Sequence, residues 1–324
     1  MPRTRLVTDA GVYDVDADWA RVPDGWSFRE VAGVATDWRS RVYVFSRSER
    51  PMMVFDSDGE FLASWGEDLF TKAHNVRVSP EGFVFCSDLL DHTVRKFTPE
   101  GELLMTLGTA NAPSDTGGDG RNSKIKRSAG PFNGPTDIAF GPSGELFVSD
   151  GYANARVHRF SAEGELLASW GGPGDKPGEF NLPHGALIEG GRTLYVADRE
   201  NNRIQVFDLK GKFVSQWTDF AGPTGISVGA DGTLVVCEFG YDPAVPTRYS
   251  VPSHGKRILP RVTMRSPEGE LIAKIEGEDK YSQGSFFAPH SICVDRGGDI
   301  YVAEVPITRH SPGACHTLQK LVKR

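Results

Sequence analysis

The sequence lacks the features of a disulfide-bonded or membrane-spanning protein. Its cysteines are few and show no CxxC spacing. The four are Cys86, Cys237, Cys293 and Cys315, and the first three lie in apolar runs typical of strands. We therefore predict reduced packing residues, neither disulfides nor metal ligands. No run of about 18 apolar residues occurs, and Met1–Leu6 has no apolar run of signal-peptide length, so we expect a cytoplasmic protein without a transmembrane helix.

A basic surface is also missing. The formal net charge is −7 and the isoelectric point is near 5.7, whereas binding nucleic acid by counterion release requires a broad basic face. The tightest basic cluster, Lys124, Lys126 and Arg127, falls in a segment rich in Gly, Ser and Asp that is typical of a solvated loop tip. We therefore expect no nucleic-acid partner and no membrane partner. The oligomeric state stays open.

The sequence is rich in glycine (37) and proline (21), and these residues mark the turns and strand entries of a repeated sequence motif, or phrase. Each copy holds a Pro-containing entry, an apolar strand, a Gly turn, a second strand ending in a small residue and Asp, a third strand, another Gly turn and a fourth strand. Phe132–Gly171 contains the complete phrase. The other copies span Trp38–Gly66, Phe70–Gly108, Phe180–Thr218, Phe220–Gly277 and Phe286–Lys323.

Six copies of a four-stranded unit predict an all-β fold, a six-bladed β-propeller. One sheet of four short strands cannot bury both of its faces alone, so the units are expected to stack radially. We expect a single domain over residues 1–324, in which a segment at about residues 1–24 closes the last blade. Unrelated hairpins in a sandwich are the alternative, and the regularity of the repeats argues against it. The pattern resembles the NHL repeat.

One position of the first strand divides the repeats into two kinds. It is histidine in the second, fourth and sixth repeats (His74, His184 and His290) and threonine in the third and fifth (Thr136 and Thr224). Alternate blades of a six-bladed wheel are a third of a turn apart, so this position predicts three imidazoles in a ring around the axis. A single histidine there would be a core residue, but three at equivalent positions indicate a divalent metal site. Because no fourth protein ligand is evident, a coordination position stays open, as in catalytic zinc sites.

The residues that end the second strands are expected at the same end of the propeller as the histidines. The second, third and fourth repeats have Asp there (Asp88, Asp150 and Asp198), but we place Arg47, Glu238 and Glu304 at this position in the first, fifth and sixth repeats. Tyr152 and Arg199 stand beside it. A phenol near a cation can act as a general base, and two guanidinium groups suit a substrate carboxylate. An ion pair between blades is the alternative for each arginine.

Three long segments, at residues 109–131, 239–261 and 305–316, leave the repeats at the same end. We expect them to form a lid or a rim that selects the substrate. Their individual roles, and those of Glu238 and Glu304, stay open.

A more specific resemblance lies in three segments, Val148–Arg156, Leu182–Gly185 and Val196–Phe207. On these residues the chain resembles the peptidyl-α-hydroxyglycine α-amidating lyases, and the likeness extends over all six repeats. A generic NHL propeller would share the glycines and the Asp. It would not share the tyrosine, the arginine and the three histidines together.

The resemblance implies a set of roles. The family binds zinc through three histidines, which match His74, His184 and His290. Its catalytic tyrosine matches Tyr152, and its two arginines match Arg47 and Arg199. The implied reaction is that of a carbon–nitrogen lyase, which cleaves an α-hydroxylated amide to an amide and an aldehyde such as glyoxylate. The metal would polarise the hydroxyl, the tyrosine would move the proton, and the arginines would hold the carboxylate of a small-molecule substrate.

The chain departs from the family at two kinds of position. Ser291 stands where the family has an Asp that binds calcium, so calcium is not expected here. The cysteines of the family's disulfides match Asn133, Ala153, Tyr195 and Val206, in agreement with a reducing compartment.

Two other functions remain open. A propeller hydrolase of the lactonase kind usually needs carboxylate and Asn ligands for an axial calcium ion, for which histidine is a poor ligand. A non-enzymatic scaffold would present a basic or apolar face and bind no metal. The natural substrate, and the choice among zinc, iron, manganese and cobalt, cannot be read from the sequence.

Overall fold

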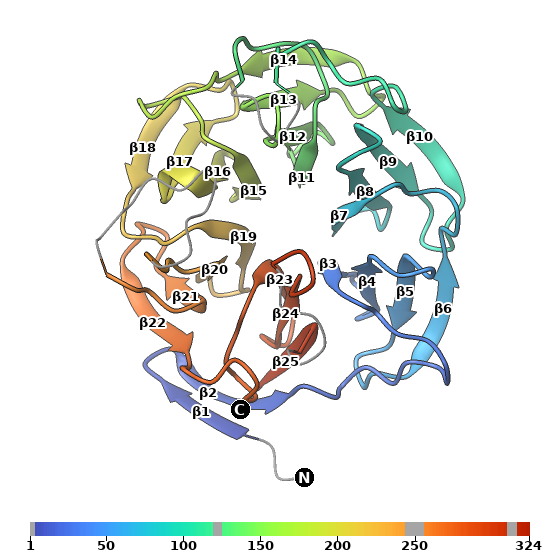
Figure 1. The fold of residues 1–324 in the computed structure, drawn as a ribbon, viewed down its shortest axis with the longest axis vertical. Helices are drawn as coiled ribbons and strands as arrows, with labels where there is room; N and C mark the ends of the chain where they lie inside the picture. The colour runs from blue at the N-terminus through green and yellow to red at the C-terminus, as the bar shows by residue number, and fades with distance from the viewer. Residues whose placement is uncertain (1–3, 119–124, 244–255, 310–315) are drawn as a thin grey trace. The chain divides into compact units, whose positions relative to one another are not determined.

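A computed structural model of the chain describes residues 4–118, 125–243, 256–309 and 316–324. Nearly all regular structure in these residues is antiparallel β-strand, and their only helical element is a 3-10 turn, η1 (Arg199–Asn201). The described part of the chain therefore holds no helix long and apolar enough to cross a membrane. The strands form six sheets (Figure 1), and the predicted fold class, an all-β six-bladed β-propeller, is confirmed.

The chain divides into two compact units of three sheets each. The second unit holds the second, third and fourth repeats. Its sheets are β7 (Ala73–Val78), β8 (Val84–Asp88), β9 (Thr93–Phe97) and β10 (Leu103–Leu107); β11 (Pro135–Phe140), β12 (Leu146–Asp150), β13 (Arg156–Phe160) and β14 (Leu166–Trp170); and β15 (Pro183–Glu189), β16 (Thr193–Asp198), β17 (Arg203–Asp208) and β18 (Phe213–Trp217).

The first unit holds the first, fifth and sixth repeats. Its sheets are β3 (Val31–Thr36), β4 (Val42–Ser46), β5 (Met52–Phe55) and β6 (Phe61–Trp65); β19 (Pro223–Val228), β20 (Leu234–Glu238), β21 (Arg261–Arg265) and β22 (Leu271–Glu276); and β23 (Pro289–Val294), β24 (Ile300–Glu304) and β25 (Leu318–Lys323), which are joined by β1 (Thr4–Thr8) and β2 (Gly11–Asp16).

The amino terminus contributes to the sheet of the last repeat. β2 pairs with β25, and β1 pairs with β2 at the outer edge, as Figure 1 shows in blue beside red. A chain that supplies the outer strands of its last sheet from its first residues ties its two ends together by backbone hydrogen bonds. The expectation of a single domain over residues 1–324 stays a prediction.

The first repeat begins earlier than the sequence indicates. We placed its start at Trp38, but β3 already runs over Val31–Thr36, and Trp38 lies half-exposed in the turn that follows. The strand was missed because its residues, Val-Ala-Gly-Val-Ala-Thr, lack the His or Thr that stands second in each of the other first strands. Its second residue, Ala32, therefore completes the column of histidines and threonines.

Burial decreases across each sheet, which explains the sequence pattern. All five residues of β12 are buried, whereas Leu166 and Leu167 of β14 are about half exposed. Between the sheets of the third and fourth repeats, aromatic and aliphatic side chains such as Phe147, Phe180 and Phe207 form one hydrophobic cluster. Burying such side chains contributes about 1.5 to 3 kcal/mol each, so the packing of neighbouring sheets stabilises the unit.

Carboxylates at the ends of the second strands close the sheets of the second, third, fourth and sixth repeats. Asp150 accepts hydrogen bonds from the backbone N–H of Asn133, just before β11, at 3.0 Å. Asp88 and Asp198 make the same connection before β7 and β15. Glu304 makes it before β23, where it accepts hydrogen bonds from two backbone N–H groups. A buried carboxylate that satisfies these donors is structural, since unpaired buried N–H groups cost free energy.

The described cysteines are packing residues, as predicted. Cys86, Cys237 and Cys293 are buried free thiols, whereas Cys315 lies outside the described residues. Burial raises the pKa of Cys237 to about 12, so this thiol stays protonated and is a poor nucleophile.

Candidate metal and acid–base site

His74 and His184 lie close together in the second unit. Each is the second residue of its first strand, β7 or β15, and the ring centroids are 4.7 Å apart. The strand ladder shifts register at this position in both sheets, between Ala73 and Asn75 and between Pro183 and Ala186. Such irregularities redirect a side chain out of the regular alternation of a strand. Both histidines are buried, at 0% and 2% exposure.

The ring of His74 has a defined tautomer. Its Nδ1 lies 2.7 Å from the backbone carbonyl oxygen of Thr136, which can only accept a hydrogen bond. The proton is therefore on Nδ1, and Nε2 carries the lone pair. Metal-binding histidines commonly donate their other N–H to a carbonyl in this way. The chemistry of the ring thus suits coordination through Nε2.

His290 has the same arrangement in the first unit. It is the second residue of β23, at a register shift between Pro289 and Ser291, and its Nδ1 lies 2.7 Å from the carbonyl oxygen of Ala32. The three predicted ligands are all buried, His74 and His184 in the second unit and His290 in the first. Neutral imidazole suits zinc, copper, iron and nickel better than calcium.

Tyr152 lies beside His74. Its hydroxyl oxygen is 3.4 Å from Nε2 of His74, and its ring meets the rings of His74 and His184 edge to face. On its other side, Nη1 of Arg199 donates a hydrogen bond to the same oxygen at 3.3 Å. The phenol therefore lies between an imidazole and a guanidinium group.

Arg199 is buried and charged. It begins η1, and its guanidinium forms an ion pair with Glu200 at 2.7 Å. Burial opposes the charge, but the Glu200 carboxylate and the Tyr152 hydroxyl more than compensate and raise the pKa of Arg199. The sequence did not single out Glu200. Its position directly after an arginine was the available signal.

Arg47 lies in the first unit and pairs with Glu30. Its Nη1 is 2.7 Å from Glu30 Oε1 and 2.7 Å from the hydroxyl oxygen of Thr308. Burial opposes ionisation of Glu30, but the hydrogen bonds from Thr308 and the charge of Arg47 lower the pKa of this carboxyl group overall. Arg47 therefore forms an ion pair, but with the residue that precedes the first strand of its own repeat and not between blades, and this partner was not foreseen.

The strand register corrects the position that we assigned to Arg47. Val31 pairs with Ser46, as Pro183 pairs with Asp198, so Ser46 occupies the column that ends the second strand. Arg47 comes one residue later and is equivalent to Arg199. The error arose because the first repeat contains no Asp to mark the strand end.

The two glutamates that we noted in this column have structural partners. Glu238 is fully buried and accepts hydrogen bonds from Arg261 at 2.9 Å and Thr263 at 2.8 Å. Glu304 closes its own sheet, and burial raises its pKa to about 7 despite the N–H donors around it.

Two further residues near His290 escaped the sequence analysis. The ring of Phe239 lies 6.3 Å from the ring of His290, and the guanidinium of Arg309 stacks over Phe239 at 4.8 Å. Phe239 directly follows the second strand of its repeat, which is the position of Arg47 and Arg199. The position that Phe239 shares with Arg47 and Arg199 was the available signal in the sequence. We missed it because we had assigned Arg47 to the preceding position of its repeat.

The long segments are only partly described. Residues 119–124, 244–255 and 310–315 lie outside the described residues, so the prediction of a lid stays untested. The described part of 109–131 packs on the third repeat, where Asn154 bonds to the backbone of Ala129. Lys124 of the basic cluster is outside the described residues, and Arg127 pairs with Asp115.

The repeats match a known family model. The NHL repeat model matches residues 132–160 and 180–207, which are the third and fourth repeats. The class is therefore an NHL-repeat β-propeller, as the sequence pattern predicts.

Among curated proteins, the chain is similar to enzymes with α-amidating names, one a monooxygenase and one a lyase. It is 34% identical over 217 residues to peptidyl-glycine alpha-amidating monooxygenase of Mus musculus, a match that covers 56% of this chain and 21% of the relative. It is 32% identical over 274 residues to peptidyl-alpha-hydroxyglycine alpha-amidating lyase 1 of Drosophila melanogaster, covering 76% of this chain and 45% of the relative. The chain thus spans less than half the length of these relatives. These matches confirm the predicted resemblance to the peptidyl-α-hydroxyglycine α-amidating lyase family.

A relative without an activity in its name matches over a greater length. NHL repeat-containing protein 3 of Homo sapiens is 27% identical over 317 residues, covering 92% of this chain and 83% of the relative. Among solved structures, a streptogramin B lyase has a TM-score of 0.60 at 16% identity, covering 96% of this chain and 98% of that one. A gluconolactonase from Xanthomonas campestris has a TM-score of 0.62 at 12% identity, covering 96% and 90%. At such identities these structures share the fold alone.

Proposed function

We propose that the protein is a metal-dependent carbon–nitrogen lyase that cleaves an α-hydroxylated amide into an amide and an aldehyde such as glyoxylate. The observation that carries the proposal is the position of Tyr152, whose hydroxyl oxygen lies 3.4 Å from His74 Nε2 and 3.3 Å from Arg199 Nη1. A buried phenol between an imidazole and a guanidinium group is suited to proton transfer. The lyase name of the Drosophila melanogaster relative supports the same reaction class.

The ligands that we propose for the metal are His74, His184 and His290. Their burial and their equivalent positions in alternate repeats support the assignment, as do the carbonyl groups that accept from Nδ1 of His74 and His290. Three neutral nitrogen donors fit zinc with an open position better than they fit calcium. A bound divalent ion would supply Lewis acidity toward the substrate hydroxyl.

Tyr152, Arg199 and Arg47 have separate roles in this proposed reaction. Tyr152 takes the proton of the substrate hydroxyl as the N–C bond breaks. The hydroxyl carbon becomes the aldehyde, and the amide nitrogen takes up the proton that Tyr152 has accepted, so that Tyr152 returns to its starting form. Arg199 orients the phenol, because its guanidinium contacts the phenolic oxygen directly. Arg199 and Arg47 are the groups that we propose for binding a substrate carboxylate.

The direct test uses α-hydroxyhippurate as substrate. The purified protein is loaded with zinc, the bound metal is quantified, and benzamide and glyoxylate are both measured. We expect the two products in equal amounts, with bound zinc near one per chain. Zinc-loaded protein that releases no glyoxylate from this compound or from a peptidyl-α-hydroxyglycine would contradict the proposed reaction. Calcium in place of zinc would indicate a hydrolase, and the absence of any bound metal would indicate a scaffold.

A further inference from the structure

The residues between the histidines in the column have a regular contact pattern. Thr136 lies between His74 and His184 in the column, and it is buried, with 0% exposure. Its carbonyl oxygen accepts the hydrogen bond of His74 Nδ1 at 2.7 Å. Its hydroxyl donates to the carbonyl oxygen of Pro183, the residue before His184, at 2.9 Å. One threonine is thus bonded to the ring of one histidine and to the backbone that carries the next.

A threonine makes the same kind of hydrogen bond in the first unit. The hydroxyl of Thr224 donates to the carbonyl oxygen of Pro289, the residue before His290, at 2.8 Å. Thr224 is 1% exposed. Two threonines in different repeats therefore hold the peptide that precedes a histidine in the following repeat. The third member of the set, Ala32, uses only its carbonyl group, because it has no hydroxyl.

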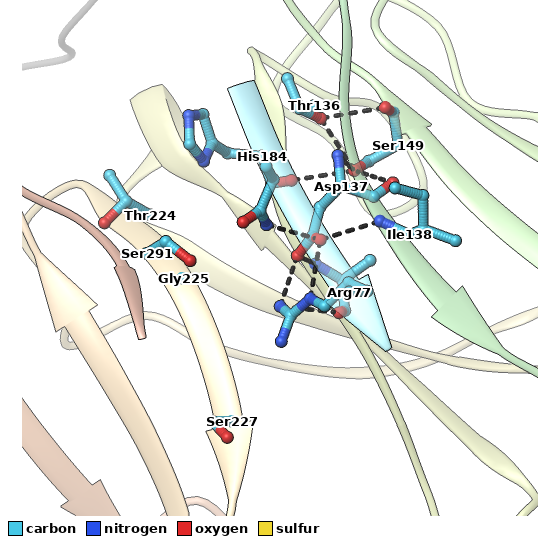
Figure 2. A network of polar contacts seen from close by, with 12 residues as sticks. Arg77, Thr136, Asp137, Ile138, Ser149, His184, Thr224, Gly225, Ser227 and Ser291 are labelled. Atoms are coloured by element: carbon cyan, nitrogen blue, oxygen red, sulfur yellow. Dashed lines mark hydrogen bonds and ion pairs between the residues drawn. The ribbon is translucent and has the colours of Figure 1, made fainter. Parts of the chain in front are cut away.

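The surroundings of Thr136 leave it little freedom. Its hydroxyl oxygen also lies 2.8 Å from Ser149 Oγ and 2.9 Å from the carbonyl oxygen of Ser149. Ser149 Oγ in turn donates to the carbonyl oxygen of His184 at 2.8 Å, as Figure 2 shows. Both carbonyl groups that flank the His184 amide are thus bound by hydroxyls of the third repeat. A Cβ atom at Gly151 would come within 2.1 Å of the Pro183 oxygen, so the close approach also depends on this glycine.

We propose that Thr136 and Thr224 are positioning residues that set the metal affinity of the site. They act through the peptides that precede His184 and His290. These two histidines lie within register shifts of the strand ladder, between the paired residues Pro183 and Ala186 and between Pro289 and Ser291. Without the hydroxyl, the Pro–His peptide gains freedom, and the imidazole loses its fixed direction. Removing a group that orients a metal ligand typically weakens metal binding by about 10- to 100-fold. This inference rests on the proposed function only for the identity of the three ligands.

The test measures zinc binding to the full-length protein by competition with a chromophoric chelator. We expect Thr136→Val and Thr224→Val each to weaken zinc binding by about tenfold or more, and Thr136→Ser and Thr224→Ser to restore it to within about threefold of the wild type. The matched control is Thr93→Val, which removes a fully buried hydroxyl that donates to Asp91 outside the column. It should leave the zinc affinity unchanged.

Thermal melting of the metal-free proteins checks that each variant folds. If a valine variant does not fold, the alanine and serine variants are compared in its place, with weak binding expected for alanine alone. Zinc affinities equal to the wild type in both valine variants would overturn the inference, as would an equal loss in Thr93→Val. Wild-type protein that binds no zinc would overturn the metal site as well. Wild-type protein that binds zinc but cleaves no substrate would overturn only the proposed reaction.

Discussion

Arg199 in the second unit and Arg47 in the first occupy equivalent positions, directly after the second strand of a sheet, yet their neighbours differ. Arg199 contacts the phenol of Tyr152 and pairs with Glu200, the next residue in the chain. Arg47 pairs with Glu30 and the hydroxyl of Thr308, which come from distant parts of the chain. Equivalent positions in a repeat therefore share a location but not a role. The role depends on which side chains the neighbouring segments bring to that location.

A second contrast separates two adjacent columns. The carboxylates that end the second strands, among them Asp88, Asp150 and Glu304, accept backbone N–H groups and close the sheets. One or two positions later, the side chain of Tyr152 contacts His74, and the side chain of Arg199 contacts Tyr152. Residues with a structural role and residues that we propose for the reaction thus lie only one or two positions apart in the sequence.

The largest effect is expected from Tyr152→Phe, which tests whether a residue just after the end of a second strand takes part in the reaction. The variant keeps the ring packing against His74 but loses the group that accepts the proton, so kcat should fall by about a thousandfold. Zinc content should stay at the wild-type level. The control is Tyr195→Phe, in the middle of β16. Unchanged glyoxylate production by Tyr152→Phe would remove this residue from the mechanism.

The structural role of a carboxylate that ends a second strand is tested at Glu304, through the pH dependence of the protein's stability. Burial raises the pKa of Glu304 in the folded protein to about 7 from an ordinary value of 4.5. Between these pH values the folded state keeps a proton that the unfolded state has lost. The contribution of this group to the free energy of unfolding is therefore fully present below pH 4.5. It declines by about 3 kcal/mol as the pH rises from 4.5 to 7.

Glu304→Gln removes the titrating group, so the difference in unfolding free energy between variant and wild type should change with pH over this range. Urea denaturation at several pH values measures it. A difference that is the same at pH 4.5 and pH 7 would show that the carboxyl group does not titrate in this window.

The smallest of these effects distinguishes the two arginines. Arg199→Gln should lower kcat/KM by about 100-fold, and Arg47→Gln by about tenfold, since hydrogen bonds to charged groups contribute about 1.5 to 3 kcal/mol. The loss at Arg199 should include kcat, because this residue contacts the phenol, whereas the loss at Arg47 should lie in KM. Steady-state kinetics with α-hydroxyhippurate separate the two.

The double variant Arg47→Gln with Glu30→Gln isolates the ion pair. If Arg47 serves only to neutralise Glu30, the double variant should regain the wild-type KM, and the proposed role in substrate binding would fall. Arg127→Gln, which removes an exposed partner of Asp115, serves as the control and should not change either constant.

Much of the fold and part of the site follow from local sequence patterns. The alternation of apolar residues and the Gly turns predict the sheets, because side-chain direction alternates along a strand and tight turns need glycine. The column of His74, His184 and His290 is visible because the same offset from a conserved phrase recurs in each repeat of this one chain. Tyr152 and Arg199 are found by their distance from a marked strand end.

What the sequence determined by itself is the six-sheet architecture and the residue types in each column, because these depend on contacts within a repeat. Only the tertiary structure decided the partners of those residues. The pairing of Arg47 with Glu30, the closure of its sheet by Glu304 and the bond from Thr136 to Pro183 join residues from different strands or repeats. Such pairings depend on strand register and on the approach of neighbouring sheets, and a shift of one residue in register reassigns every partner.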